Sequence, residues 1–143
     1  MAWSSSLKTS GSSEPEATMT LMTTLAVAAG GLVGAPSRFL VDRRISDSWE
    51  SDFPLGTFAI NATGSLLLGL FVGLSLAGHL SSEWLAFLGT GFCGAFTTFS
   101  TWSFETVRLI EEGEYLQAGL NLGLSVVVGL VVAGAGLALG LAS

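Results

Sequence analysis

The stretch GTGFCGAFTTFSTWSFE, residues 89–105, carries no charge before its last residue, yet its composition is poorly suited to an unbroken helix. Glycines lower helix propensity, and clustered threonine and serine hydroxyls bond to nearby backbone groups in competition with the helical hydrogen bonds. The residues concerned are Gly89, Gly91, Gly94, Thr97, Thr98, Ser100, Thr101 and Ser103. They predict a helix that breaks near the centre of a bilayer. Carbonyls freed by such a break need a partner, and a small cation is one candidate.

The few charged residues around this stretch are unevenly placed. Of 143 residues, five are Lys or Arg and eleven are Asp or Glu, and four uncharged windows cover residues 17–37, 53–82, 84–104 and 115–143. The shortest windows hold 21 residues, which as helix reach about 31 Å and match a hydrocarbon core about 30 Å thick. We therefore expect an all-α membrane protein with four transmembrane helices.

The same composition excludes several classes of protein. A net charge of −6 with five basic residues gives no electrostatic basis for binding nucleic acid. The single cysteine, Cys93, allows neither an intrachain disulfide nor a thiolate metal site. Nearly all ionisable groups fall in the tail and loops, which argues against an enzyme. Burying four helices on every side would take a much larger soluble protein.

The chain divides into a short tail and one membrane unit. Residues 1–18 are rich in Ser and Thr and lack hydrophobic periodicity, which predicts a disordered or interfacial tail, and residues 19–143 form the membrane unit. The true start could be later than Met1, because Met19 and Met22 lie just before the first window. The expected helices are about Met19–Val41 with Pro36 near its end, a second from Pro54 to Ala77 capped by Ser51 or Asp52, Glu83–Ile110, and Tyr115–Leu141.

Short connections make neighbouring helices alternate in direction, so both termini are expected on one side of the membrane. Basic residues near helix ends favour the cytoplasmic side. They are Arg38, Arg43, Arg44 and Arg108 on the side of the first and third connections, against Lys8 on the other side. This predicts that both termini face outward. The difference in basic residues between the two sides is small, so a population of chains inserted the other way round is also compatible with it.

Polar side chains follow two of the predicted helices at helical spacing. Thr57, Asn61 and Ser65 share one face of the second helix, and Asn121 and Ser125 lie four apart in the fourth. An asparagine amide in hydrocarbon is costly unless it is paired or lines a watery path. A structural hydrogen bond between helices is the alternative for Asn61, but two such rows favour a polar pathway. A third row, Phe92, Phe96 and Phe99, is aromatic.

Three motifs together resemble the Fluc/CrcB family of fluoride channels. They are GGLVGAPSRF (30–39), GTFAINATGS (56–65) and GFCGAFTTFSTWSFE (91–105), in the order and spacing of that family. The resemblance covers about residues 22–140. It implies a four-helix subunit of a multi-pass channel in the plasma membrane, which lets cytoplasmic fluoride leave passively and lowers fluoride toxicity. It also implies an antiparallel, dual-topology dimer with two narrow pores and a structural sodium ion at the centre of the interface.

The resemblance assigns roles to individual positions of this sequence. It makes Asn61 the pore-lining amide with Thr57 one turn away, and Phe99 and Trp102 the two rings that fluoride passes. It makes Thr101 and Ser125 hydroxyls of the path, Arg38 a residue near the pore mouth, and Gly94 and Thr97 the donors of backbone carbonyls to sodium. Glu105 matches an acid that follows the rings.

Two positions depart from the family pattern. Trp102 stands where phenylalanine is usual, and its indole donor and larger ring are expected to narrow the pore or to change ion transfer. Asn121 stands where an aromatic hydroxyl is often found. Both departures affect the assignment of site residues more than they affect the resemblance to the family.

Three other interpretations remain at this point. A small multidrug-type proton-coupled exporter needs a titratable carboxylate in mid-membrane, normally in the first helix, and residues 17–37 contain none. An assembly subunit that transports nothing would not explain two polar rows beside a broken helix. The arginine bias also leaves open whether the pair is a homodimer or a heterodimer with an oppositely oriented paralogue.

Overall fold

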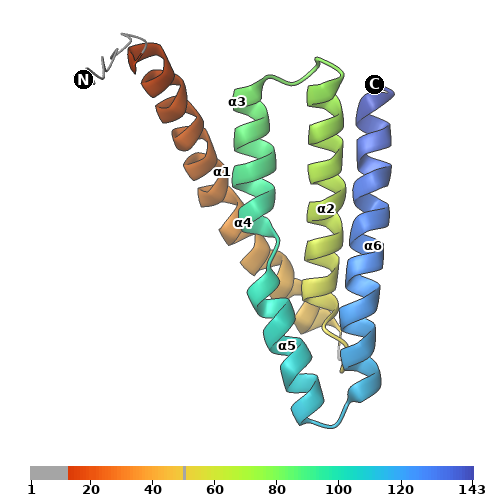
Figure 1. The fold of residues 1–143 in the computed structure, drawn as a ribbon. Helices are drawn as coiled ribbons and strands as arrows, with labels where there is room; N and C mark the ends of the chain where they lie inside the picture. Colours follow the sequence, from red (N-terminus) through yellow and green to blue (C-terminus); the bar gives the residue numbers. More distant parts are fainter. Residues whose placement is uncertain (1–12, 50) are drawn as a thin grey trace, which may run out of the picture.

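The chain is a bundle of helices, described by a computed structural model over residues 13–49 and 51–143. These residues contain no strand, which confirms the all-α prediction (Figure 1). In chain order the elements are the helices α1 (Ser13–Ser48), α2 (Leu55–Leu76) and α3 (Ser82–Leu85), the π-helix η1 (Ala86–Cys93), and the helices α4 (Gly94–Phe96), α5 (Phe99–Glu111) and α6 (Tyr115–Leu141).

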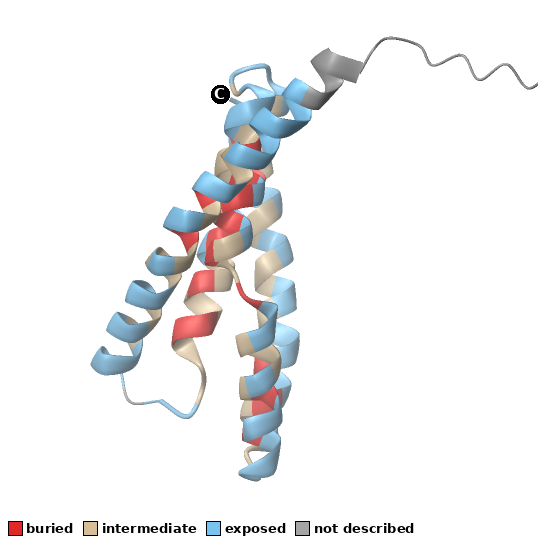
Figure 2. Cartoon of the chain, turned by 90° about the vertical axis from the view of Figure 1, so that its left-hand side faces the viewer, coloured by how far each residue is buried: buried red, intermediate tan, exposed pale blue. Residues whose placement is uncertain are grey.

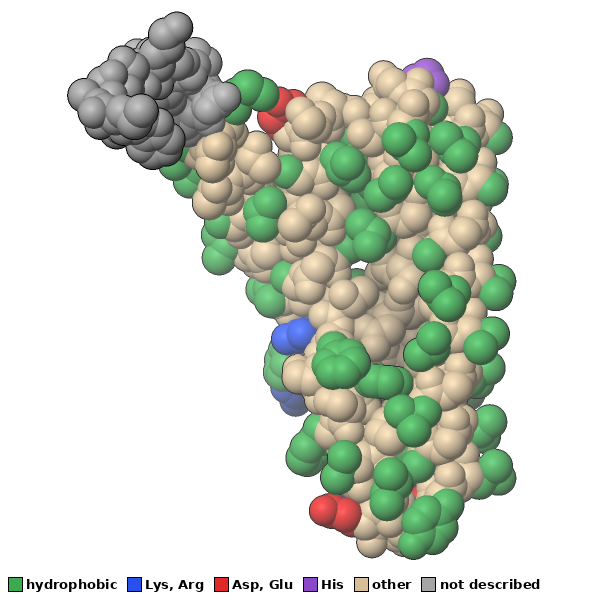
Figure 3. All heavy atoms as spheres, viewed as in Figure 1, with side chains coloured by type: hydrophobic (Ala, Val, Ile, Leu, Met, Phe, Trp, Pro, Cys, Tyr) green, Lys and Arg blue, Asp and Glu red, His purple; other side chains and the backbone are tan. Residues whose placement is uncertain are grey.

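Three of the helices are continuous and apolar enough to cross a membrane. They are α1 from Thr18, α2 and α6. The fourth crossing is the interrupted series α3, η1, α4 and α5, which runs the length of the bundle (Figure 1). Hydrophobic side chains are spread over the visible face, acidic ones lie near its two ends, and basic ones lie about halfway along its left edge (Figure 3). The four-helix membrane fold is thus confirmed, with the beginning of α1 and the end of α6 at the same end of the bundle (Figure 1).

The first helix is longer than predicted at both ends. It begins at Ser13 rather than Met19, so the expected boundary between tail and membrane unit falls inside α1; residues 1–12 of that tail lie outside the described part. It ends at Ser48 rather than Val41, with Pro36 in its interior. Its last turns carry an ion pair between Arg43 and Asp47 with an N···O distance of 3.6 Å, a spacing that favours helix by a few tenths of a kcal/mol, about 0.2–0.5.

The other boundaries lie close to the predicted ones. The predicted cap of α2 is wrong, because the helix begins only at Leu55 after Pro54, and the Ser51 hydroxyl instead accepts a 3.2 Å hydrogen bond from the Phe53 amide. The third crossing begins at Ser82, and α6 has the predicted bounds.

Close backbone approach through glycine holds the helices together. Carbonyl oxygens of the neighbouring helix occupy the space that a Cβ atom would need: that of Ala133 at Gly69, and that of Leu66 at Gly136. Gly30 of α1 meets η1 in the same way. Small residues permit such packing where no hydrophobic force drives helices together in lipid. The buried residues accordingly form a narrow column along the middle of the bundle (Figure 2).

A methyl group added at Gly136 should destabilise the bundle, whereas the same change at Gly134 should not. The new Cβ would meet the Leu66 carbonyl at Gly136, while nothing lies within 4 Å of a Cβ at Gly134. We expect Gly136→Ala to lower the free energy of unfolding by about 1–3 kcal/mol, measured by thermal unfolding in detergent. Equal losses in both variants would show that α2 and α6 do not meet this closely.

Candidate functional site

The helix break predicted from the sequence is present between α4 and α5. Thr97 has φ −75° and ψ 161°, and Thr98 has φ −147° and ψ 123°, so both residues are extended. The break is preceded by the π-helix η1, which the sequence did not predict. Such widened turns are uncommon in proteins, and those that do occur are often found at functional sites.

Asn61 of α2 pairs with the backbone of the break at two points. Its Nδ2 donates to the Thr98 carbonyl at 3.0 Å, and its Oδ1 accepts from the Thr98 amide at 2.8 Å. One carboxamide thereby satisfies both main-chain groups of an extended residue that has no helical partner there. An unpaired buried donor or acceptor costs about 1–3 kcal/mol, so this contact stabilises the unwound conformation. Asn61 Nδ2 has this one acceptor among the described residues, so its second hydrogen can be donated to another group.

Thr98 also begins the next helix. Its hydroxyl accepts a 3.2 Å hydrogen bond from the Thr101 amide and donates one to the Thr101 Oγ1 at 3.0 Å. This is the N-cap arrangement, in which a side-chain oxygen satisfies one of the free amides of the first turn. Sequence reasoning missed Thr98 as a site residue, although a threonine just before a helix start was the available signal.

The break changes the surroundings of two carbonyl groups. In a continuous helix the Thr98 amide would donate to the Gly94 carbonyl, four residues earlier, but here it donates to Asn61. Within the described part of the chain, the hydrogen-bond donor to the Thr97 carbonyl is Arg38 Nη1 at 3.5 Å, the outer limit for a hydrogen bond. The carbonyl oxygens of Gly94 and Thr97 thus keep spare lone pairs, and Gly94 is exposed. Such oxygens are suitable ligands for a small hard cation.

A groove of about 550 Å³ lies beside the break. It brings together six residues that the sequence predicted for the site, namely Asn61, Gly94, Thr97, Phe99, Trp102 and Ser125. Its remaining lining is Ser65, Leu68, Gly89, Thr90, Cys93, Thr98 and Val126. The groove therefore combines an amide, several hydroxyls and two aromatic rings, without a charged side chain.

The aromatic rings of the groove form a pair. Phe99 and Trp102 have ring centroids 5.2 Å apart and planes inclined by 46°. The Phe99 side chain is 76% exposed in the single chain. The predicted aromatic row is interrupted, because Phe92 and Phe96 stack on each other at 5.5 Å before the break. Phe99 is thus free to face outward.

Three predicted residues do not line this groove. Thr57 is 1% exposed, and its hydroxyl lies near the Glu105 carboxylate without a hydrogen bond of standard geometry. Thr101 is half-buried and serves the cap of α5. Arg38 reaches the break from α1 through its contact with the Thr97 carbonyl.

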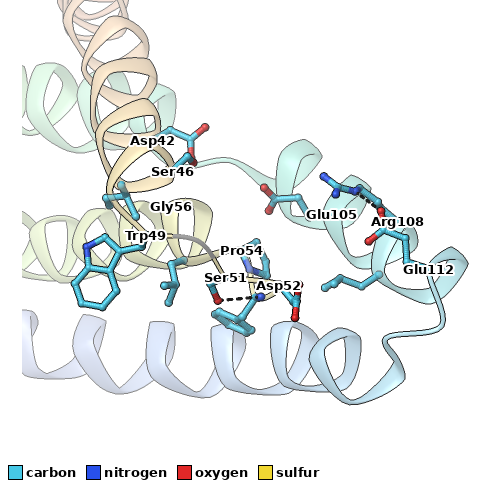
Figure 4. A pocket seen from close by; sticks show the side chains of 14 residues that line it. Asp42, Ser46, Trp49, Ser51, Asp52, Pro54, Gly56, Glu105, Arg108 and Glu112 are labelled. Carbon is cyan, nitrogen blue, oxygen red and sulfur yellow. Dashed lines mark hydrogen bonds and ion pairs between the residues drawn. The ribbon is translucent and has the colours of Figure 1, made fainter.

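A second, more polar hollow of about 340 Å³ lies between α1, α2 and α5 (Figure 4). Asp42 and Ser46 come from α1, Glu105 and Arg108 come from α5, and Glu112 directly follows the end of α5. Arg108 Nε donates to Glu112 Oε1 at 2.8 Å. In the described part of the chain, no group of three or more His, Cys, Asp or Glu side chains could hold a metal ion.

Comparison with known proteins decides the family. The family model described as "CrcB-like protein, Camphor Resistance (CrcB)" matches residues 25–137. The chain belongs to the CrcB family. It is 50% identical over 115 residues to "Fluoride-specific ion channel FluC 1" of Streptomyces avermitilis, covering 80% of this chain and 93% of the relative. It is 47% identical over 111 residues to "Fluoride-specific ion channel FluC" of Pyrococcus abyssi, covering 77% and 89%.

Proposed function

We propose that this CrcB-family chain is a subunit of a fluoride-selective channel, a multi-pass protein of the plasma membrane and not an enzyme. The channel lets fluoride leave the cytoplasm passively and so lowers its toxicity. The observation that carries the proposal is the groove of neutral donors and ring edges beside the break, held by Asn61. Relatives named as fluoride-specific channels support it.

The groove suits a small, strongly hydrated anion. Water lost on entry must be replaced by donors, and the groove supplies the second Asn61 amide hydrogen and the hydroxyls of Ser65 and Thr90. The hydroxyls of Thr97 and Ser125 also line it, but they donate to the Cys93 carbonyl and to the Asn121 Oδ1 and would have to exchange these bonds for the anion. The electropositive edges of Phe99 and Trp102 add weaker attraction without a fixed charge. A fixed cation would bind the ion tightly and slow its release.

The proton-coupled exporter is less consistent with the structure. It needs a titratable carboxylate in mid-membrane, and α1 has none between residues 17 and 37. Glu105 is half-buried, but it lines the hollow at one end of the bundle rather than the groove. The groove itself has no ionisable carboxylate.

The active unit proposed here is a dimer of oppositely oriented chains. In the single chain the Phe99 ring and the Gly94 backbone are exposed beside the groove, so the groove needs a further wall to become a pore. The partner is either a second copy of this chain or an oppositely oriented paralogue. Cross-linking the purified chain in lipid should give a dimer with fluoride efflux activity; a monomer alone would contradict the homodimer.

A sodium ion at the centre of this dimer fits the donor set of the break. The carbonyls of Gly94 and Thr97 from each chain would hold it, giving the oxygen ligands that such a cation prefers. When bound, it supplies positive charge that compensates the carbonyl dipoles and favours anions nearby. The Arg38 contact leaves a second lone pair on the Thr97 carbonyl for this role.

Efflux from liposomes tests the function and the cation together. Vesicles that contain the purified chain and are loaded with potassium fluoride should release fluoride within seconds in sodium-containing buffer once valinomycin lets potassium carry the compensating charge. The release is followed with a fluoride electrode, and vesicles loaded with chloride should release none on that timescale. Replacing sodium with N-methylglucamine on both sides should slow the release. Absence of efflux in sodium, or equally fast chloride release, would contradict the channel; undiminished efflux without sodium would contradict the cation alone.

A further inference from the structure

Asn121 of α6 is a fully buried amide whose hydrogen bonds all go to one small group of residues. It is 0% exposed. Its Nδ2 donates to the Thr106 hydroxyl at 2.9 Å and lies 3.4 Å from the Trp102 carbonyl, and its Oδ1 accepts from the Ser125 hydroxyl at 3.3 Å. Asn121 does not line the groove, whereas two of its partners, Trp102 and Ser125, do.

The contact with Trp102 is reciprocal. The Trp102 indole Nε1 donates to the Asn121 main-chain carbonyl at 2.9 Å, while the Asn121 side chain reaches the Trp102 main-chain carbonyl. Thr106, which receives the Asn121 amide, donates in turn to the Trp102 carbonyl at 2.8 Å. The tryptophan ring is therefore fixed from α6, and its only donor points away from the ion path.

Asn121 also determines what Ser125 can offer to an ion. A serine hydroxyl has one hydrogen to donate, and here that hydrogen goes to the Asn121 Oδ1. An anion in the groove must take this hydrogen in exchange. At 3.3 Å the bond is long for two oxygen atoms, so breaking it for the anion costs little free energy.

We propose that Asn121 is a positioning residue of the anion path. Its main-chain carbonyl orients the Trp102 ring, and its side chain holds the Trp102 main chain and the Ser125 hydroxyl without meeting the ion. This inference rests on the proposed channel function. It joins the two departures from the family pattern, Trp102 and Asn121, into one hydrogen-bonded unit. It also makes the two positions interdependent, because each side chain contacts the main chain of the other.

A double-mutant comparison separates positioning from simple support of the fold. Asn121→Leu keeps the size of the side chain and removes its side-chain hydrogen bonds, while the main-chain carbonyl that accepts from the Trp102 indole stays in place. In the wild-type background we expect it to slow fluoride efflux per assembled channel by about tenfold, because a loss of about tenfold corresponds to the net free energy of roughly one hydrogen bond. In a Trp102→Phe, Ser125→Ala background it should change efflux by less than about twofold. Leu120→Ala, on the exposed side of the same turn, is the control and should leave efflux unchanged.

Each outcome of this comparison decides the inference. The same loss of efflux in both backgrounds would show that Asn121 only supports the fold. If Asn121→Leu released fluoride as fast as the wild type, the inference would also be overturned, while the channel function would stand. If the wild-type chain released no fluoride, the proposed function would fail first and the inference with it. A large loss confined to the wild-type background would support it.

Discussion

The pairing of the Asn61 carboxamide with the Thr98 backbone is the interaction on which the rest of the site depends. A residue with extended backbone inside a membrane helix is tolerated only where its amide and carbonyl find partners. Asn61 supplies both, at 2.8 and 3.0 Å. The packing of α2 against the break depends on a second local feature, since the Thr97 methyl group occupies the place of a Cβ at Gly64. One asparagine and one glycine, a turn apart in α2, thus fit the unwound segment.

The groove follows from this unwinding. Because the Thr98 amide goes to Asn61, the Gly94 carbonyl loses its usual helical donor, and because α5 restarts after Thr98, Phe99 is turned outward beside Trp102. The donors gathered there are neutral, in keeping with a chain whose charged residues avoid the membrane windows. A path built from neutral donors binds an anion weakly enough to release it.

Sequence reasoning was most successful where a local cause decides the structure. The uncharged windows gave four crossings, the bounds of α6 were correct, and the glycines and hydroxyls of residues 89–105 located the break. It failed where distant residues decide. The partner of Asn61 could not be known without the tertiary fold, and the burial of Asn121 behind Trp102 required the packing of α5 on α6. The predicted end of α1 is wrong because the last turns of this helix are polar, and a polar stretch between apolar windows also predicts a loop.

Amide hydrogen exchange at Thr98 tests the central claim most directly. In threonine-labelled channel in lipid nanodiscs, nuclear magnetic resonance should find the Thr98 amide protected in the wild type and in the control variant Ser65→Ala, which changes the next groove-lining residue of α2. In Asn61→Leu the amide should exchange at least about tenfold faster, because its acceptor is gone. Equal protection of Thr98 in Asn61→Leu would contradict the account, since something other than Asn61 would then hold the break.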